Sequence, residues 1–158
     1  MDARDIHFAV EQLQTAYVRC IDSDRLEEWP EFFTEDCFYQ IISAGNHARG
    51  LPMGLVYADS RNMLVDRVVA LRQANVYELQ RYRHLVSSLA IVDAANLSAV
   101  RAETNYLVVR TMQGGDSSIF SAGCYLDLID LTGPKPLFRE KRVVFDSERV
   151  DTLLAIPL

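Results

Sequence analysis

Apolar residues in the first 22 positions recur at steps of three and four, the spacing that puts side chains on one face of a helix. They are Ile6, Ala9, Val10, Leu13, Ala16, Tyr17, Cys20 and Ile21. This pattern predicts an amphipathic helix that ends near Asp22. Asp24 followed by Glu27 has the spacing of a capping box, which predicts a short second helix that Trp29 and Pro30 bring to an end.

The next part of the chain is predicted to form a strand, a loop and a third helix. Residues 38–42 are predicted to form a strand, and residues 45–54, with three glycines and Pro52, a long surface loop. Asp59 or Ser60 can cap a third helix that ends near Asn75. Its apolar positions are Leu64, Val65, Val68, Val69 and Leu71.

Beyond residue 84 the period of the apolar positions changes to two, which is typical of strands. Residues 84–92, 100–108, 120–128 and 137–146 are predicted strands, with turns at 114–116 and 133–136. On the third of them one face consists of Phe120, Ala122, Cys124, Leu126 and Leu128. Helices followed by an antiparallel meander predict one α+β domain over residues 1–158, with helices packed on one face of a curved sheet.

Composition and charge narrow the function. Lys and Arg number 16 against 22 Asp and Glu, a net charge of −6, which argues against a nucleic-acid or anionic-membrane surface. The first residues lack the pattern of a signal peptide, and no segment has the apolar length of a membrane span, so we expect a cytoplasmic protein. Cys20, Cys37 and Cys124 lie in apolar patterns and are expected to be reduced core thiols.

The chemistry available to the chain is limited. His7, His47 and His84 lie on different predicted elements, and no Cys-x-x-Cys or Cys-x-His pair occurs, so we expect no metal site. General acid–base chemistry needs only a His or carboxylate with a partner in a pocket. The candidates for such a pocket are Asp22, Asp36, Tyr39, Tyr82 and His84. Alternatively, these side chains are caps, core groups and structural hydrogen-bond partners.

Two features favour assembly with other subunits. The chain has 14 Arg and only two Lys, and ten acidic residues lie in positions 1–36, so an acidic end precedes a basic middle. The interface candidates in that basic middle are Arg61, Arg67, Arg72, Arg81 and Arg83. The apolar ending adds Leu153, Leu154, Ile156 and Leu158, which either pack under the chain's own sheet or fill a subunit interface.

Residues 81–84 form the densest group of polar side chains that the sequence singles out. In a strand, Arg81 and Arg83 lie on one face and Tyr82 and His84 on the other. We expect the arginines at an interface and His84 in a structural hydrogen bond.

Several segments together resemble a known family. They are residues 22–24, 28–30 and 33–39, then 58–60, 63–67, 71–72, 75–78 and 81–84, and the ending 150–158. In these the chain resembles the small (beta) subunits of bacterial aromatic-ring-hydroxylating Rieske oxygenases. The likeness is greatest to the branch that acts on aromatic acids: terephthalate dioxygenase, salicylate 5-hydroxylase and anthranilate dioxygenase.

The resemblance implies a nuclear-transport-factor-2-like (cystatin-like) cone and a structural, non-catalytic role. It implies a homotrimer of small subunits within a hexamer that contains three alpha subunits. The alpha subunit would hold the Rieske [2Fe-2S] cluster and a mononuclear Fe(II), with electrons from NAD(P)H through a reductase. It offers no catalytic residue in this chain. The fold also occurs in enzymes, so the alternatives are a stand-alone lyase or isomerase using His84 or Asp36 with Tyr39, or a small-ligand binding module.

Overall fold

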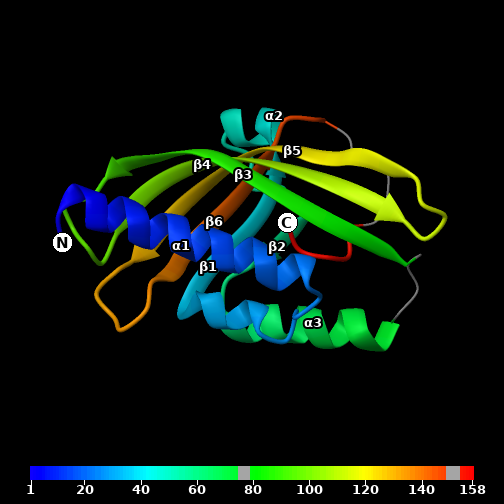
Figure 1. Ribbon diagram of the computed structural model, residues 1–158, viewed down its shortest axis with the longest axis horizontal. Coiled ribbons are helices and arrows are strands. Elements are labelled where there is room, and N and C mark those ends of the chain that lie inside the picture. The colour runs from blue at the N-terminus through cyan, green and yellow to red at the C-terminus, as the bar shows by residue number, and fades with distance from the viewer. Residues whose placement is uncertain (75–78, 149–153) are drawn as a thin grey trace.

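A six-stranded, strongly curved sheet wraps around the first helix (Figure 1). The computed structural model describes residues 1–74, 79–148 and 154–158. Helix α1 (Ala3–Asp22) buries most of the predicted apolar stripe, but Ala16 is exposed, and Gln14 and Val18, which the stripe did not include, are buried. Asp2 caps it by accepting hydrogen bonds from the main-chain N–H groups of Arg4 and Asp5, and Asp5 accepts one from the N–H of Asp2. The predicted end of the helix at Asp22 is confirmed.

The helix predicted after Asp24 is not formed. Asp24 has a φ of 57° and its N–H donates to the carbonyl of Ile21, so this residue terminates α1. A helix N-cap requires extended backbone instead. Turns lead into a 3₁₀ helix, η1 (Trp29–Phe32). Pro30 lies in its first turn and does not stop it, because no hydrogen bond within the helix needs an N–H at that position.

The middle of the chain contains more regular structure than its sequence pattern suggested. Strand β1 (Phe33–Ser43) is longer than the predicted 38–42, and the expected loop begins with a short helix, α2 (Ala44–Ala48). Strand β2 (Val56–Ala58) and helix α3 (Arg61–Ala74) follow, and Ser60 Oγ accepts a hydrogen bond from the N–H of Met63. The predicted end of this helix at Asn75 lies outside the described residues.

The buried face of α3 is narrower than predicted. Leu64 and Val68 are buried, whereas Val65 and Val69 are 42% and 46% exposed. Helix α3 packs on η1 and β1 from below the sheet and has no second layer on its outer side in Figure 1, so only one stripe of the helix is covered.

The second half forms the predicted meander. Strands β3 (Gln80–Asp93), β4 (Val100–Met112), β5 (Ser117–Asp130) and β6 (Leu137–Phe145) pair antiparallel in chain order. The full strand order is β2-β1-β6-β5-β4-β3. The β1–β6 pair is parallel, so the otherwise antiparallel sheet has one parallel ladder that the sequence did not predict.

The two faces of this sheet differ. The inner face packs against α1, η1 and the C-terminal residues, and its core is rich in aromatic rings in edge-to-face contact, among them Tyr17, Trp29, Phe33 and Tyr39. On β5 the inward side chains are Tyr125, Asp127 and Ile129. The predicted apolar face of β5, apart from Phe120, is therefore the outer one.

Candidate functional site

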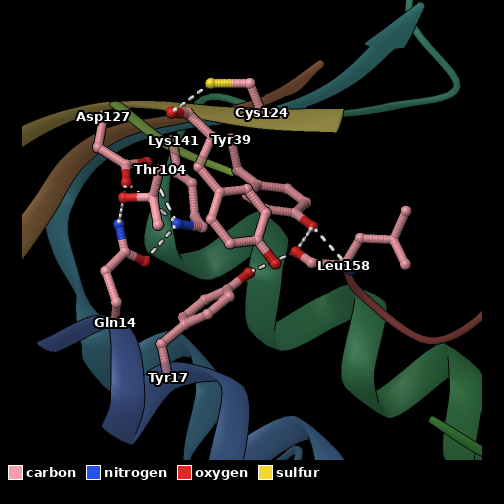
Figure 2. Close-up of polar contacts among 9 residues, drawn as sticks. Gln14, Tyr17, Tyr39, Thr104, Cys124, Asp127, Lys141 and Leu158 are labelled. Carbon is pink, nitrogen blue, oxygen red and sulfur yellow. Dashed lines mark hydrogen bonds and ion pairs between the residues drawn. The ribbon is translucent and has the colours of Figure 1, made fainter. Parts of the chain in front are cut away.

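A lysine is completely enclosed under the sheet, and it organises the main polar cluster of the interior (Figure 2). Lys141 on β6 lies with Nζ 3.2 and 3.3 Å from the two carboxylate oxygens of Asp127 on β5. Its Nζ also donates to Gln14 Oε1 on α1 at 3.1 Å. Gln14 in turn donates through Nε2 to Asp127 and to Thr104 Oγ1 on β4. The cluster therefore joins α1 to three strands.

Aromatic rings enclose the ammonium group on its remaining sides. Nζ of Lys141 lies 3.7 Å from the ring centre of Tyr125, 4.2 Å from Phe138 and 4.6 Å from Tyr17. Such contacts stabilise a cation that has lost its water. Burial nevertheless lowers the pKa of Lys141 to about 8, and burial also raises the pKa of Asp127.

These shifts predict a pH dependence. Between pH of about 8 and about 10, the folded chain has released the proton of Lys141 while the unfolded chain still holds it. The unfolded state then binds more protons, so the free energy of unfolding should rise with pH in this window. We expect this rise relative to the Lys141→Met/Asp127→Leu variant, measured by urea unfolding at several pH values. If the free energy of unfolding changed with pH in the same way in both proteins, this prediction would be wrong.

The C-terminal residues fill the deepest part of the interior. The carbonyl oxygen of Leu158 accepts hydrogen bonds from the hydroxyls of Tyr17 at 2.8 Å and Tyr39 at 3.0 Å, as Figure 2 shows. The main-chain N–H of Leu158 donates back to the hydroxyl of Tyr39 at 3.2 Å. Burial raises the pKa of Tyr39 to about 12. Both tyrosine hydroxyls are thus neutral and are used by the chain itself.

Of the predicted tail residues, Leu154, Ile156 and Leu158 are buried within this chain, and Leu153 lies outside the described residues. Arg67 on α3 donates to the carbonyl of Leu154 at 3.0 Å and so connects the tail to the helix. Of the two alternatives for the tail, the described part packs under its own sheet.

Asp22 and His84 form a second buried pair, between the end of α1 and β3. Asp22 accepts a hydrogen bond from the main-chain N–H of His84 at 2.8 Å, and its other oxygen lies 2.6 Å from Nδ1 of the ring. The His84 side chain has no exposed surface, and Nε2 has no hydrogen-bond partner among the described residues. In a neutral ring this contact favours the tautomer with the proton on Nδ1, in which Nε2 is a hydrogen-bond acceptor.

The other predicted pocket residues do not join this pair into one site. Asp36 is exposed on β1, so its prediction as a pocket residue is wrong: the bulged start of β1 turns its side chain to solvent. Tyr39 contacts the tail, as described. Tyr82 is buried with its ring 6.2 Å from that of His84, and with Asp22 and Ile156 it borders a cavity of about 320 Å³.

Three of the five predicted interface arginines bind groups of their own chain. Arg61 donates through Nε and Nη2 to the carbonyl of Phe33, and Arg67 holds the tail. Arg72 pairs with Asp24 at 3.0 Å and Glu27 at 2.7 Å, and the hydrogen bond that it donates to Glu27 raises the pKa of Arg72. Arg81 and Arg83 are exposed on the outer side of β3.

The sequence reading missed Gln14, Asp127 and Lys141. The sequence contained a partial signal for Asp127, which lies between Leu126 and Leu128, but Lys141 lies within the continuous charged run 139–142. Charged residues in a strand ordinarily lie on the face that contacts solvent. Nothing in the local sequence shows that β5 and β6 direct Asp127 and Lys141 toward the interior.

The cysteines and histidines give no metal centre in the described ranges. Cys20 and Cys37 are buried, and burial raises the pKa of each thiol to about 11, as expected of core thiols. Cys124 is half-buried on the outer face of β5. Among residues 1–74, 79–148 and 154–158, no three His, Cys, Asp or Glu side chains are grouped so that they could hold a metal ion. In the same residues, no helix has the length and apolar character to cross a bilayer.

Comparison with known proteins gives consistent matches over nearly the whole chain. The profile of the family described as "Ring hydroxylating beta subunit" matches residues 3–152. The anthranilate 1,2-dioxygenase small subunit of Burkholderia cepacia is 46% identical over 151 residues, which cover 96% of this chain and 93% of that protein. Terephthalate 1,2-dioxygenase terminal oxygenase subunit beta 1 of a Comamonas species is 43% identical, with coverage of 90% and 92%.

A solved structure gives the same result for the fold. A beta subunit assigned to an aromatic-ring-hydroxylating dioxygenase of Novosphingobium aromaticivorans superposes with a TM-score of 0.90 at 39% identity. The match covers 99% of each chain. The nuclear-transport-factor-2-like fold expected from the sequence is confirmed.

Proposed function

The chain belongs to the ring-hydroxylating beta subunit family, and from this premise we propose that it is the structural small subunit of a Rieske oxygenase that hydroxylates an aromatic carboxylic acid. That it is a small subunit of an aromatic ring-hydroxylating dioxygenase follows from the family match and the 46% identity. The observation that carries the proposal is this similarity over 96% of the chain. The recognition made from the sequence is confirmed.

The substrate class is drawn from the relatives. The two curated relatives are named for anthranilate and terephthalate, both carboxylic acids on an aromatic ring. We propose an acid of this type, with salicylate as a further member of the class that the sequence resemblance suggested. The ring would be oxidised in the alpha subunit.

The cofactors are placed outside this chain for a structural reason. The residues that the structure describes contain no ligand set that fits an iron ion or an iron–sulfur cluster, and His7, His47 and His84 lie on α1, α2 and β3. Iron and its cluster need grouped Cys, His and carboxylate ligands. We therefore place the Rieske [2Fe-2S] cluster and the mononuclear Fe(II) in the alpha subunit, supplied with electrons from NAD(P)H through a reductase in the cytoplasm.

The filled interior supports a structural role. A lyase or isomerase of this fold would need room beside Tyr39, and there the carbonyl of Leu158 takes the hydroxyls of both Tyr17 and Tyr39. A small-ligand binding module that used Tyr39 would need the same space. We propose that the small subunit is a rigid support on which the oxygenase assembles, as a homotrimer within a hexamer of three alpha and three beta subunits.

One observation favours a second candidate function, proton transfer by His84. Asp22 orients its ring, and Nε2 is buried with no partner in the described part of the chain. A carboxylate that fixes the tautomer of a histidine is also the arrangement of a general base. This candidate uses Asp22 as the partner of His84, in place of the predicted Tyr39.

Coexpression tests the proposal. The chain would be produced with the large subunit of an aromatic-ring-hydroxylating oxygenase, and the complex analysed by native mass spectrometry, iron content and turnover of anthranilate, salicylate and terephthalate. We expect three copies of each subunit, iron only with the large subunit, and turnover only by the complex. A complex assembled with His84→Gln should keep near-normal turnover. Turnover by the isolated chain that His84→Gln abolishes would replace this proposal with the second candidate.

A further inference from the structure

Strand β3 is the longer of the two strands at the margins of the sheet. The strand order puts β2, with three residues, at one margin and β3, with 14, at the other. A strand at a margin presents a row of main-chain N–H and C=O groups that no neighbouring strand binds, and such a row can pair with a strand of another molecule. Because β2 is so short, this hazard lies mainly at β3.

The composition of β3 does nothing to prevent such pairing. Residues 85–92 read Leu-Val-Ser-Ser-Leu-Ala-Ile-Val and contain no charged residue, no proline and no glycine. Segments of this length and composition pair readily into sheets made of many chains. Leu85 is 51% exposed and Val92 is 57% exposed. In the described part of the chain, no segment other than β4 hydrogen-bonds to the main chain of residues 85–92.

The same segment contains one residue too many for its ladder with β4. Ser87 pairs with Asn105 and Ala90 pairs with Glu103, so Ser88 and Leu89 together lie opposite the single residue between those partners. This arrangement is a β-bulge, which bends a strand and increases its twist. Ser88 has a φ of 55°, in the left-handed region that is unfavourable for any residue except glycine. The chain therefore accepts local strain to keep this bend.

The bulge reverses which positions of β3 face the interior. Before it, Tyr82, His84 and Val86 face the core, and after it Leu89 and Ile91 do so. The inward positions thus change from even to odd numbers at Ser88, whose own side chain is exposed. Without Ser88, the same five residues would follow a strict period of two. Ser88 contributes the bend and nothing to the core.

Two further features interrupt the margin on either side of the bulge. Ile91 pairs with Ala102 and Asp93 pairs with Arg101, so Val92 is a second extra residue on β3. Toward the start of the strand, the main-chain N–H of His84 donates to the carboxylate of Asp22. The apolar segment therefore lies between a donor that is already bound and a second bend.

We propose that the bulge at Ser88 and Leu89 blocks the margin of β3, so that the sheet of one molecule does not pair with the sheet of another. Pairing along a strand requires donors and acceptors that are evenly spaced and point the same way. The bulge displaces those in the middle of the uncharged segment, where a second strand would bind. The inference is independent of the proposed function, because it holds for any number of copies in the natural assembly.

Deletion of Ser88 tests this inference. The shortened strand loses the bulge and keeps the five inward residues, so circular dichroism should show the natural fold. Sedimentation velocity of the purified full-length variant should then reveal assemblies that grow with concentration. We expect its weight-average sedimentation coefficient to be about twofold or more above that of the natural chain. Ser88→Gly is the matched control: it keeps the bulge, tolerates the positive φ and should leave the size unchanged.

Hydrogen–deuterium exchange locates the contact in these assemblies. We expect the amides of residues 85–92 to exchange more slowly in the deletion variant than in the natural chain, because they become paired. A deletion variant that does not fold would show that the core requires Ser88, and one that folds and keeps the natural size would show that the bulge blocks nothing. Either result overturns the inference. Growth without slower exchange at residues 85–92 also overturns it, since the contact would then lie elsewhere.

Discussion

Replacing Lys141 with methionine is expected to lower the free energy of unfolding by about 3–5 kcal/mol, the cost of leaving one partner of a buried ion pair alone. The side chain of Lys141 has no exposed surface, and neither has that of Asp127. Without the ammonium group, the hydrogen bond that the Asp127 carboxylate keeps among the described residues comes from Gln14. The measurement is equilibrium unfolding in urea at pH 7.

The chain provides a matched control, because its only other lysine, Lys135, is exposed. Lys135→Met should change stability by less than about 0.5 kcal/mol. The double variant Lys141→Met/Asp127→Leu should recover most of the loss, since apolar replacements of a buried pair are often neutral or better. If Lys141→Met alone unfolds like the natural chain, the cluster does not hold α1 to the sheet.

Ending the chain after residue 153 is expected to prevent cooperative folding. The deletion removes the buried side chains of Leu154, Ile156 and Leu158, each worth about 1.5–3 kcal/mol when fully buried. It also leaves the hydroxyls of Tyr17 and Tyr39 without the carbonyl that they share. The sum approaches the whole stability of a typical domain of about 5–15 kcal/mol.

Milder changes keep this prediction measurable. Leu158→Ala retains the carbonyl acceptor and should cost about 2–5 kcal/mol through the cavity it creates. Ala155→Ser, at a half-buried position of the same segment, should have a small effect. Differential scanning calorimetry compares the three proteins. A shortened chain that melts as the natural chain does would show that the tail contributes nothing to the core.

Family and fold class were accessible from the sequence alone. The apolar residues of α1, from Ile6 to Ile21, recur at helical spacing. Those of the meander recur at every second position, with turn residues between the strands. Both patterns follow from the local backbone geometry, which places residues a few positions apart on the same face. The residues that make each pattern are therefore close together in the sequence. The segments that identified the family, such as residues 81–84, are equally local.

The tertiary structure decided what each side chain meets. The parallel pairing of β1 with β6 joins segments about 100 residues apart, and no local period indicates it. Lys141 and Asp127 were missed for the same reason, since alternation shows only that two residues share a face. In the structure, α1 packs on the face of β5 that carries Asp127, and the face that carries Leu126 is the outer one. Burial depends on which distant element covers a face, and that choice is made by the energy of the whole fold.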